Sequence, residues 1–246
     1  MAIAIVDNRI CSEAKATLSD FGFKILEIPS TKRLSPPIAS HPDMLIFLHN
    51  NKIITEKRFA NEEGRDFFSK LKSLAPHIEI SLCEEEFEKD YPHDAILNAL
   101  IIGEAILLRK KSISKSITDY AEKAGLQIIE TNQGYPACTT LALGSNLAIT
   151  ADDGAKKALR EYGADVFEIR NGDISLPPYE YGFIGGATGI YGKYAFFIGN
   201  PALHRDGEKI ISACKKASLI PIPLCERNLT DLGRILFIEE NIQNNA

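Results

Sequence analysis

Histidine, aspartate and cysteine side chains stand at similar places along the chain, and their chemistry is considered first. His41 and Asp43 flank Pro42, just before an apolar stretch that is typical of a buried strand. Residues two apart on a strand face the same side of the sheet. A carboxylate beside an imidazole can orient it as a base, or bind a planar cation through two hydrogen bonds. The alternative is structural, with Asp43 accepting hydrogen bonds from backbone N–H groups of the turn.

Two later positions repeat this arrangement. His93 and Asp94 precede the next apolar stretch, and because neighbouring strand residues face opposite sides, only one of them can point inward. Cys138 takes the corresponding place further along the chain. An imidazole from His41 or His93 could activate its thiol as a nucleophile. The alternative is a buried cysteine that packs as a small hydrophobic residue.

Glycines and a late aspartate complete the set of candidate residues. Residues 185–189 have the composition of a phosphate-binding loop, but such loops precede a helix, and here a turn and an apolar strand follow. We therefore expect Gly185 and Gly186 to allow close backbone approach beside a ligand. Thr230 and Asp231 occupy the last corresponding position, and we expect them to contact the ligand as well. Asp206 is expected to be the N-cap of a helix.

The elements that position these residues form a repeat. Each copy is predicted to run strand, strand, helix, strand, and the clearest copy occupies residues 181–224, with a tight turn at Gly192. In that copy Ser218 stands where the other helices end in glycine. The copies begin roughly 45–52 residues apart, a period that is typical of propellers and repeat arrays. Their starting positions are His41, His93, Cys138, Gly185 and Thr230.

The two ends of the chain complete one copy between them. Residues 2–28 read as strand, helix and strand, and residues 228–238 match the front half of a copy without its helix. Pairing these segments would close a ring and leave no exposed sheet edge. We predict one α/β domain over residues 1–246, a five-bladed α/β propeller closed by its N- and C-terminal segments. The alternative is a doubly wound parallel sheet, which would place a helix, not a hairpin turn, between successive strands.

Composition excludes several classes of protein. The 246 residues carry a formal net charge of −5 at pH 7, which argues against a nucleic-acid-binding face. The best apolar stretch, residues 95–108, is shorter than the ~20 residues of a transmembrane helix and contains Glu104. The five cysteines are scattered without a C-x-x-C pair, which indicates reduced thiols in the cytoplasm. We therefore expect no metal site, no cofactor, no nucleic-acid partner and no membrane partner; the sequence does not define the oligomeric state.

Three short motifs, combined with the repeat, carry a resemblance to a known superfamily. They are His41-Pro42-Asp43, the Gly-Phe-Ile-Gly-Gly segment at residues 182–186, and Asp231-Leu232-Gly233. The chain resembles the pentein superfamily of guanidino-group-modifying enzymes, which includes arginine deiminases, amidinotransferases, agmatine deiminases and dimethylarginine dimethylaminohydrolases. It is most similar to an uncharacterised branch of that superfamily. The resemblance covers essentially the whole chain and implies the five-bladed α/β propeller, called the pentein fold.

This resemblance also implies a function for the central channel. It implies a small cationic ligand, guanidino or amino-acid-like, bound by Asp43, His93 or Asp94, Gly185, Gly186, Thr230 and Asp231, with His41 and Cys138 as catalytic candidates. Enzymes of the superfamily carry their nucleophilic cysteine at the start of the last module's strand.

In this chain residues 230–234 contain no cysteine, and Cys225 lies several residues too early. This departure argues against covalent deiminase or hydrolase chemistry. It leaves open an amidino-group hydrolase or transferase relative without the usual nucleophile, and it leaves open whether Cys138 or Cys225 is reactive. The alternative is a non-catalytic pentein that binds a macromolecular partner through its rim, similar to the ribosome anti-association initiation factor.

Overall fold

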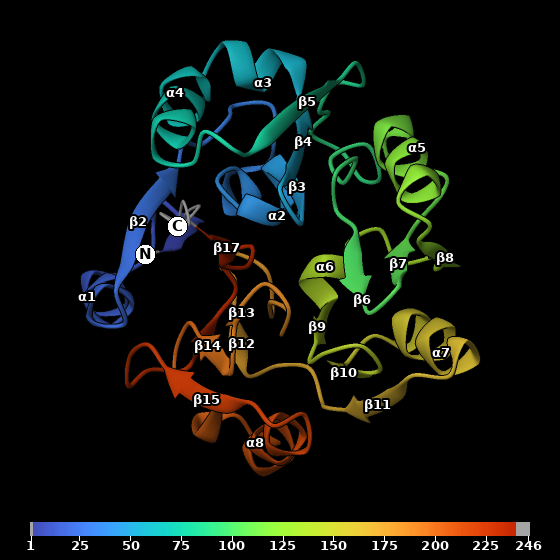
Figure 1. The fold of residues 1–246 in the computed structure, drawn as a ribbon. Helices are drawn as coiled ribbons and strands as arrows, with labels where there is room; N and C mark the ends of the chain where they lie inside the picture. The colour runs from blue at the N-terminus through green and yellow to red at the C-terminus, as the bar shows by residue number, and fades with distance from the viewer. Residues whose placement is uncertain (1, 240–246) are drawn as a thin grey trace, which may run out of the picture.

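Five three-stranded sheets surround a central axis, and helices cover their outer sides (Figure 1). The computed structural model describes residues 2–239. In each sheet the inner strand pairs antiparallel with the middle strand, which pairs parallel with the outer strand. From inner to outer, the strands are β17 (Leu236–Glu239), β1 (Ala2–Asp7) and β2 (Phe23–Ile28); β3 (Ile46–His49), β4 (Lys52–Glu56) and β5 (Glu79–Cys83); β6 (Leu100–Ile102), β7 (Ala105–Leu108) and β8 (Gln127–Glu130); β9 (Thr140–Ala142), β10 (Leu147–Thr150) and β11 (Asp165–Glu168); and β13 (Thr188–Tyr191), β14 (Tyr194–Phe197) and β15 (Ile220–Pro223).

The helices connect each middle strand to its outer strand. They are α1 (Ser12–Asp20), α3 (Lys57–Asn61), α4 (Arg65–Leu74), α5 (Lys115–Lys123), α7 (Asp153–Tyr162) and α8 (Gly207–Lys216). α7 shows the local signals clearly, because Asp152 accepts the Ala155 N–H at its start and left-handed Gly163 ends it. Two helices, α3 and α4, lie between β4 and β5, and Gly64 stands in the connection between them. A Cβ on Gly64 would lie 2.8 Å from the Phe59 carbonyl oxygen.

Ser218 takes the backbone conformation that glycine supplies in other modules. Gly22, Gly125 and Gly163 follow their helices with φ of 87°, 68° and 100°, and Ser218 follows α8 with φ of 59°. The sequence prediction that Ser218 replaces glycine there is confirmed. α1 begins at Ser12, and Cys11 takes its N-cap position without a side-chain capping hydrogen bond.

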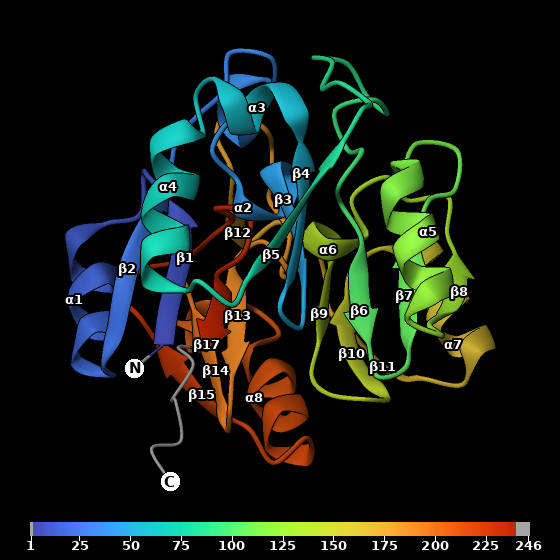
Figure 2. The same ribbon diagram turned by 45° about the horizontal axis from the view of Figure 1, so that its top comes forward.

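The chain closes the ring through its ends, as predicted. β1 pairs antiparallel with β17, with Ala2 opposite Glu239 and Ile5 opposite Leu236. The alternative of a doubly wound parallel sheet is wrong, because five separate mixed sheets replace one continuous sheet. Figures 1 and 2 show both ends of the described chain beside the same module. The predicted domain, residues 1–246, extends slightly beyond the described residues.

Aromatic rings seal the junction between this closing module and the module before it. Phe196 of β14 is fully buried, with its ring 5.5 Å from the ring of Phe23 in β2 and 5.5 Å from that of Phe237 in β17. The Phe23 and Phe237 rings lie 4.8 Å apart. These contacts join segments from both ends of the chain to a neighbouring module, so the closing sheet is held by side chains as well as by strand pairing.

Two short helices at the centre of the ring were not predicted. α2 (Pro42–Leu45) leads into β3, and α6 (Pro136–Thr139) leads into β9. Each has proline in its first turn, where the missing N–H costs no hydrogen bond. The expectation that His41 and Asp43 share one face of a strand was therefore wrong, because Asp43 is helical. An additional two-stranded sheet, β12 (Ile174–Ser175) with β16 (Leu229–Thr230), precedes the last inner strand.

The helices of the described chain are too short and too polar to cross a bilayer.

Candidate functional site

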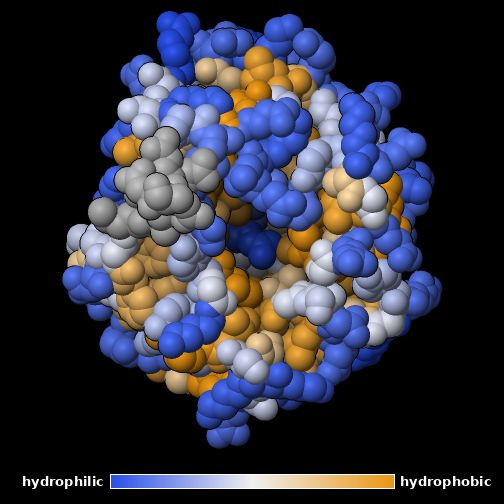
Figure 3. Space-filling model, in the orientation of Figure 1, coloured by the Kyte–Doolittle hydropathy of each residue, from blue (hydrophilic) through white to orange (hydrophobic). Residues whose placement is uncertain are grey.

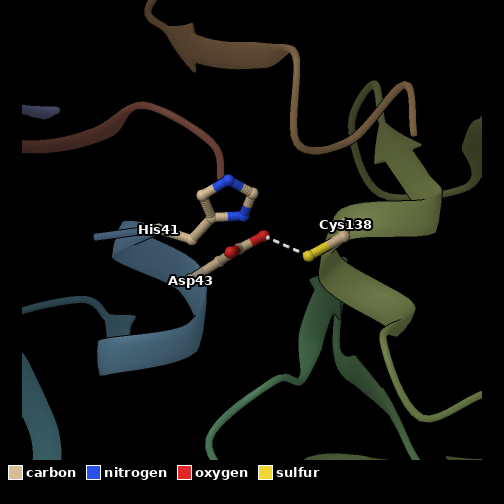
Figure 4. A group of neighbouring side chains, drawn as sticks. All are labelled: His41, Asp43 and Cys138. Carbon is tan, nitrogen blue, oxygen red and sulfur yellow. Dashed lines mark hydrogen bonds between the residues drawn. The ribbon is translucent and has the colours of Figure 1, made fainter. Parts of the chain in front are cut away.

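α2 and α6 bring the first three candidate residues together. His41 precedes α2 and Asp43 lies in it, while Cys138 lies in α6. All three side chains are buried, and Figure 4 shows them directed toward one another. The Cys138 thiol donates a hydrogen bond to Asp43 Oδ2 at 3.0 Å. The structure thus places a histidine, an acid and a thiol from two different modules in one buried group.

Asp231 joins this group from the segment between β16 and β17. Its Oδ1 lies 3.9 Å from His41 Nδ1, and its side chain is 1% exposed. The carboxylate is held by two backbone donors, the N–H of Phe183 at 2.9 Å and the N–H of Gly233 at 3.1 Å. No hydrogen bond from a lysine or arginine reaches it within the described part of the chain. A buried carboxylate with this set of partners favours a bound cation or a proton.

The predicted glycines lie against the same residues. A Cβ on Gly186 would lie 1.8 Å from Asp231 Oδ1, and a Cβ on Gly185 would lie 2.1 Å from the Ala137 carbonyl oxygen. No side chain larger than hydrogen fits at either position without displacing its neighbours. The copy predicted from residue 181 has its first strand later, since β13 begins at Thr188 and residues 181–187 precede it.

The other predicted residues do not reach the group. His93 is exposed, and Thr230 is only partly buried in β16. Asp94 is buried but binds elsewhere, because the Tyr135 hydroxyl donates to its Oδ2 at 2.6 Å. Cys225 is buried and interacts electrostatically with Cys11, which immediately precedes α1 on the outer side of the ring. His41, Asp43, Cys138 and Asp231 are therefore the predicted residues that the structure brings together.

Sequence reasoning missed Asn98. Its amide nitrogen donates to Cys138 Sγ at 3.2 Å and to the Asp43 carbonyl oxygen at 3.2 Å, and its amide oxygen accepts the Ala137 N–H at 2.8 Å. Asn98 stands two residues before β6, as Cys138 stands two residues before β9. Aligning the modules on the first residues of their inner strands would have found Asn98. Aligning them on His-Asp pairs selected His93 and Asp94 instead.

Burial controls the ionisation of this group. It raises the pKa of Asp231 to about 7, with the neighbouring Asp43 as the next cause, and raises that of Asp43 to about 6. It also raises the pKa of the Cys138 thiol well above its usual value. Burial, assisted by the charge of Arg9, lowers the pKa of His41 to about 3. The imidazole is therefore neutral at physiological pH.

A cavity of about 480 Å³ opens onto the group. His41, Cys138 and Asp231 line it, together with Glu180. Its remaining walls are largely aromatic and apolar, formed by Ile38, Met44, Tyr91, Tyr135, Leu176, Tyr179, Tyr181 and Phe183. The lining contains two acids and no lysine or arginine. Its volume falls within the range of about 300–1,000 Å³ for small-molecule sites.

A second, smaller cavity of about 170 Å³ lies between the inner strands. Arg234 and Asp43 contribute its polar groups, and residues of β3, β6, β13 and β17 form most of its apolar wall. Figure 3 shows the centre of the ring hollowed, with hydrophilic atoms at its floor and apolar residues along its right and lower sides. Arg234 has a φ of 73°, and its N–H donates to the Gly186 carbonyl oxygen at 2.8 Å. Asp43 thus borders the smaller cavity, while Cys138 borders the larger one.

Comparisons with solved structures identify the fold. A dimethylarginine dimethylaminohydrolase from Pseudomonas aeruginosa matches with a TM-score of 0.56 and 11% identity, over 91% of each chain. An amidinotransferase of the saxitoxin biosynthetic pathway from Microseira wollei matches with a TM-score of 0.51 and 14% identity, over 89% of this chain and 87% of that one. The inosamine-phosphate amidinotransferase of Streptomyces griseus matches with a TM-score of 0.52 and 12% identity, over 95% of this chain and 82% of that one.

These matches confirm the pentein fold that the repeat predicted. Within that fold, residues 5–236 match the model of a family of unknown function, DUF6873. The chain belongs to this family. No curated protein matches the sequence significantly.

Proposed function

We propose that this protein binds a small organic cation, guanidino or amino-acid-like, in the 480 Å³ cavity. The observation that carries the proposal is Asp231, a buried carboxylate at a cavity whose lining holds a second acid, Glu180, and no basic residue except His41. Since burial lowers the pKa of His41 to about 3, the imidazole supplies no positive charge at neutral pH. A cationic ligand would provide the positively charged partner that the Asp231 carboxylate lacks.

The walls of the cavity suit the rest of such a ligand. Tyrosine and phenylalanine faces attract cations by about 0.5–2 kcal/mol, more when water is excluded. Tyr179, Tyr181 and Phe183 lie on one continuous segment of the wall, and Glu180 is exposed beside them. Glu180 is therefore placed to contact a second positive charge, such as the amino group of an amino acid.

The same ligand class appears in the names of the matched structures. Their names describe amidinotransferases and a hydrolase of dimethylarginine, all of which act on guanidino or amidino groups. Because their sequences are only 11–14% identical to this chain, these matches show a shared fold and nothing more, and the ligand is inferred from the cavity. A channel filled with apolar side chains would favour the alternative, in which the rim binds a macromolecular partner. Inward-facing acids and a thiol at the cavity favour a small ligand.

Calorimetric titration with arginine, agmatine and methylated arginines tests this proposal. We expect at least one compound to bind, and Asp231→Asn to weaken it by about 2–5 kcal/mol, the usual cost of removing one partner from a desolvated charge pair. Asp119→Asn is the matched control, because Asp119 is on the outer helix α5 and pairs with Lys115 of that helix. Equal affinities for the wild type and a folded Asp231→Asn variant would contradict the proposal.

A further inference from the structure

One group of donor atoms in the described chain has the composition of a transition-metal site. His41, Asp43 and Cys138 each offer one ligand atom, and these atoms all lie within 4.8 Å of one another. All three residues are buried, with relative exposures of 1%, 4% and 4%. Imidazole nitrogen, thiolate sulfur and carboxylate oxygen are the three kinds of ligand that bind Zn²⁺ in proteins.

Unpartnered atoms give a second, independent reason to expect a ligand here. Within the described residues, neither ring nitrogen of His41 has a hydrogen-bond partner, and neither does Asp43 Oδ1. Buried polar atoms in folded proteins are nearly always paired, and exceptions mark functional sites or unobserved ions. A metal ion bound to one imidazole nitrogen and one carboxylate oxygen would satisfy two of these three atoms together.

We propose that His41, Asp43 and Cys138 bind one Zn²⁺-like ion, with a fourth coordination position open toward the cavity. In a tetrahedral site with the usual bond lengths, ligand atoms lie about 3.4–3.6 Å apart. The Cys138 Sγ–Asp43 Oδ2 distance is 3.0 Å, and the donor atoms of all three residues lie within 4.8 Å of one another, so small side-chain shifts would bring them to this spacing. The inference goes beyond the proposed function and stands whether or not an organic cation binds.

The surrounding charges suit such an ion. The buried Arg234 guanidinium interacts electrostatically with both Asp43 and Cys138. Three negative groups, the Cys138 thiolate and the Asp43 and Asp231 carboxylates, would balance this arginine and a divalent cation together, in a setting where an unbalanced charge is costly. Asp231, with its Oδ1 3.9 Å from His41 Nδ1, lies beside one proposed ligand and lines the cavity onto which the fourth position would open. Three protein ligands and one open position form the arrangement of catalytic rather than structural zinc sites.

The sequence expectation of no metal site rested on the absence of closely spaced cysteines. Here Asp43 and Cys138 are 95 positions apart, and α2 and α6 bring them together across two modules. Short-range spacing carries no information about a site of this kind. Asn98 donates to Cys138 Sγ and fixes the sulfur from a third module.

The test is reconstitution with Zn²⁺ or Co²⁺ in the absence of any organic ligand, followed by removal of free metal. We expect about one retained ion per chain by elemental analysis, and a thiolate-to-cobalt charge-transfer band in the near ultraviolet. Cys138→Ser should remove the band, and Cys138→Ser or His41→Ala should weaken binding at least tenfold. Cys214→Ser is the matched control, since Cys214 is also fully buried but lies in the outer helix α8.

A second measurement covers variants that fail to fold. In the wild-type protein, bound metal should slow alkylation of Cys138 at least tenfold, as measured by mass spectrometry, and leave the rate at Cys11 unchanged. Failure of the wild type to retain metal would overturn the inference, and so would a charge-transfer band that persists in Cys138→Ser. Because no organic ligand is present, either result leaves the proposed function untouched.

Discussion

Asn98 holds two charged or ionisable neighbours in place while it carries no charge of its own. Its amide nitrogen contacts Cys138 Sγ and the Asp43 backbone, and its oxygen contacts the Ala137 N–H. These bonds join three modules at the centre of the ring. A carboxylate at this position would add a third buried acid beside Asp43 and Asp231, so an amide suits the site better than an acid does.

The position of the thiol leads to a prediction about covalent chemistry. Residues 230–234 lack the cysteine that the superfamily's enzymes carry there, Cys138 is only 4% exposed, and Cys225 lies outside the site. We expect no hydrolysis of arginine, agmatine or methylated arginines through a covalent intermediate. A haloacetamidine should accordingly leave the cysteines without a stoichiometric, active-site-directed adduct, as measured by mass spectrometry. A stoichiometric adduct on Cys138 or Cys225 that disappears in His41→Ala would reverse this conclusion.

Among the elements, α8 is tied to the neighbouring module by an ion pair rather than by a side-chain cap. Asp206 was predicted as a capping residue, and it does occupy the N-cap position, but its side chain makes no capping bond. Asp206 Oδ2 instead accepts the Arg170 backbone N–H at 2.8 Å, and Oδ1 pairs with the Arg170 guanidinium at 2.9 Å. The hydrogen bond from Arg170 holds the pKa of Asp206 well below its usual range.

This ion pair predicts a pH-dependent stability difference. Because the folded pKa of Asp206 is depressed, its contribution is complete above the unfolded value of about 4 and is lost as the pH falls through the folded value. Asp206→Asn should therefore lower the free energy of unfolding at neutral pH, and the difference from wild type should shrink in acid. Urea unfolding across this range measures it, with Asp119→Asn as control. A difference independent of pH would show that ionisation is not the cause.

The sequence predicted the elements of the ring better than it predicted the site. Apolar runs and glycine signals located the strands and helices of all five modules, because those features depend on local patterns. α2 and α6 were missed because four-residue helices are too short to show a helical period. The sequence predicted that His41, Asp43, Cys138 and Asp231 share the central channel. Asn98 was missed because the search for His-Asp pairs selected His93 and Asp94, which stand farther from β6.

For the whole molecule, ring closure explains why the N- and C-terminal segments are predicted to be indispensable. β1 has β17 on one side and β2 on the other, and Phe237 of β17 contacts both Phe23 and Phe196. Removal of β17 would expose one edge of β1 and uncover these rings. It would also remove Asp231 if the deletion began at Thr230, so the fold and the site depend on the same segment.

A truncation and a circular permutation test this closure together. Deleting residues 230–246 should abolish cooperative unfolding, because an unpaired apolar edge and an opened aromatic cluster remove more stability than a domain usually has, about 5–15 kcal/mol.

In the permuted chain, a short linker joins the natural ends, and the new ends lie in the exposed turn at residues 144–146. Since Ala2 and Glu239 are paired, the linker spans a short gap, and this variant should unfold cooperatively. Circular dichroism during thermal unfolding distinguishes the two variants. A truncated chain that melts cooperatively near the wild-type temperature would show that closure does not hold the ring together.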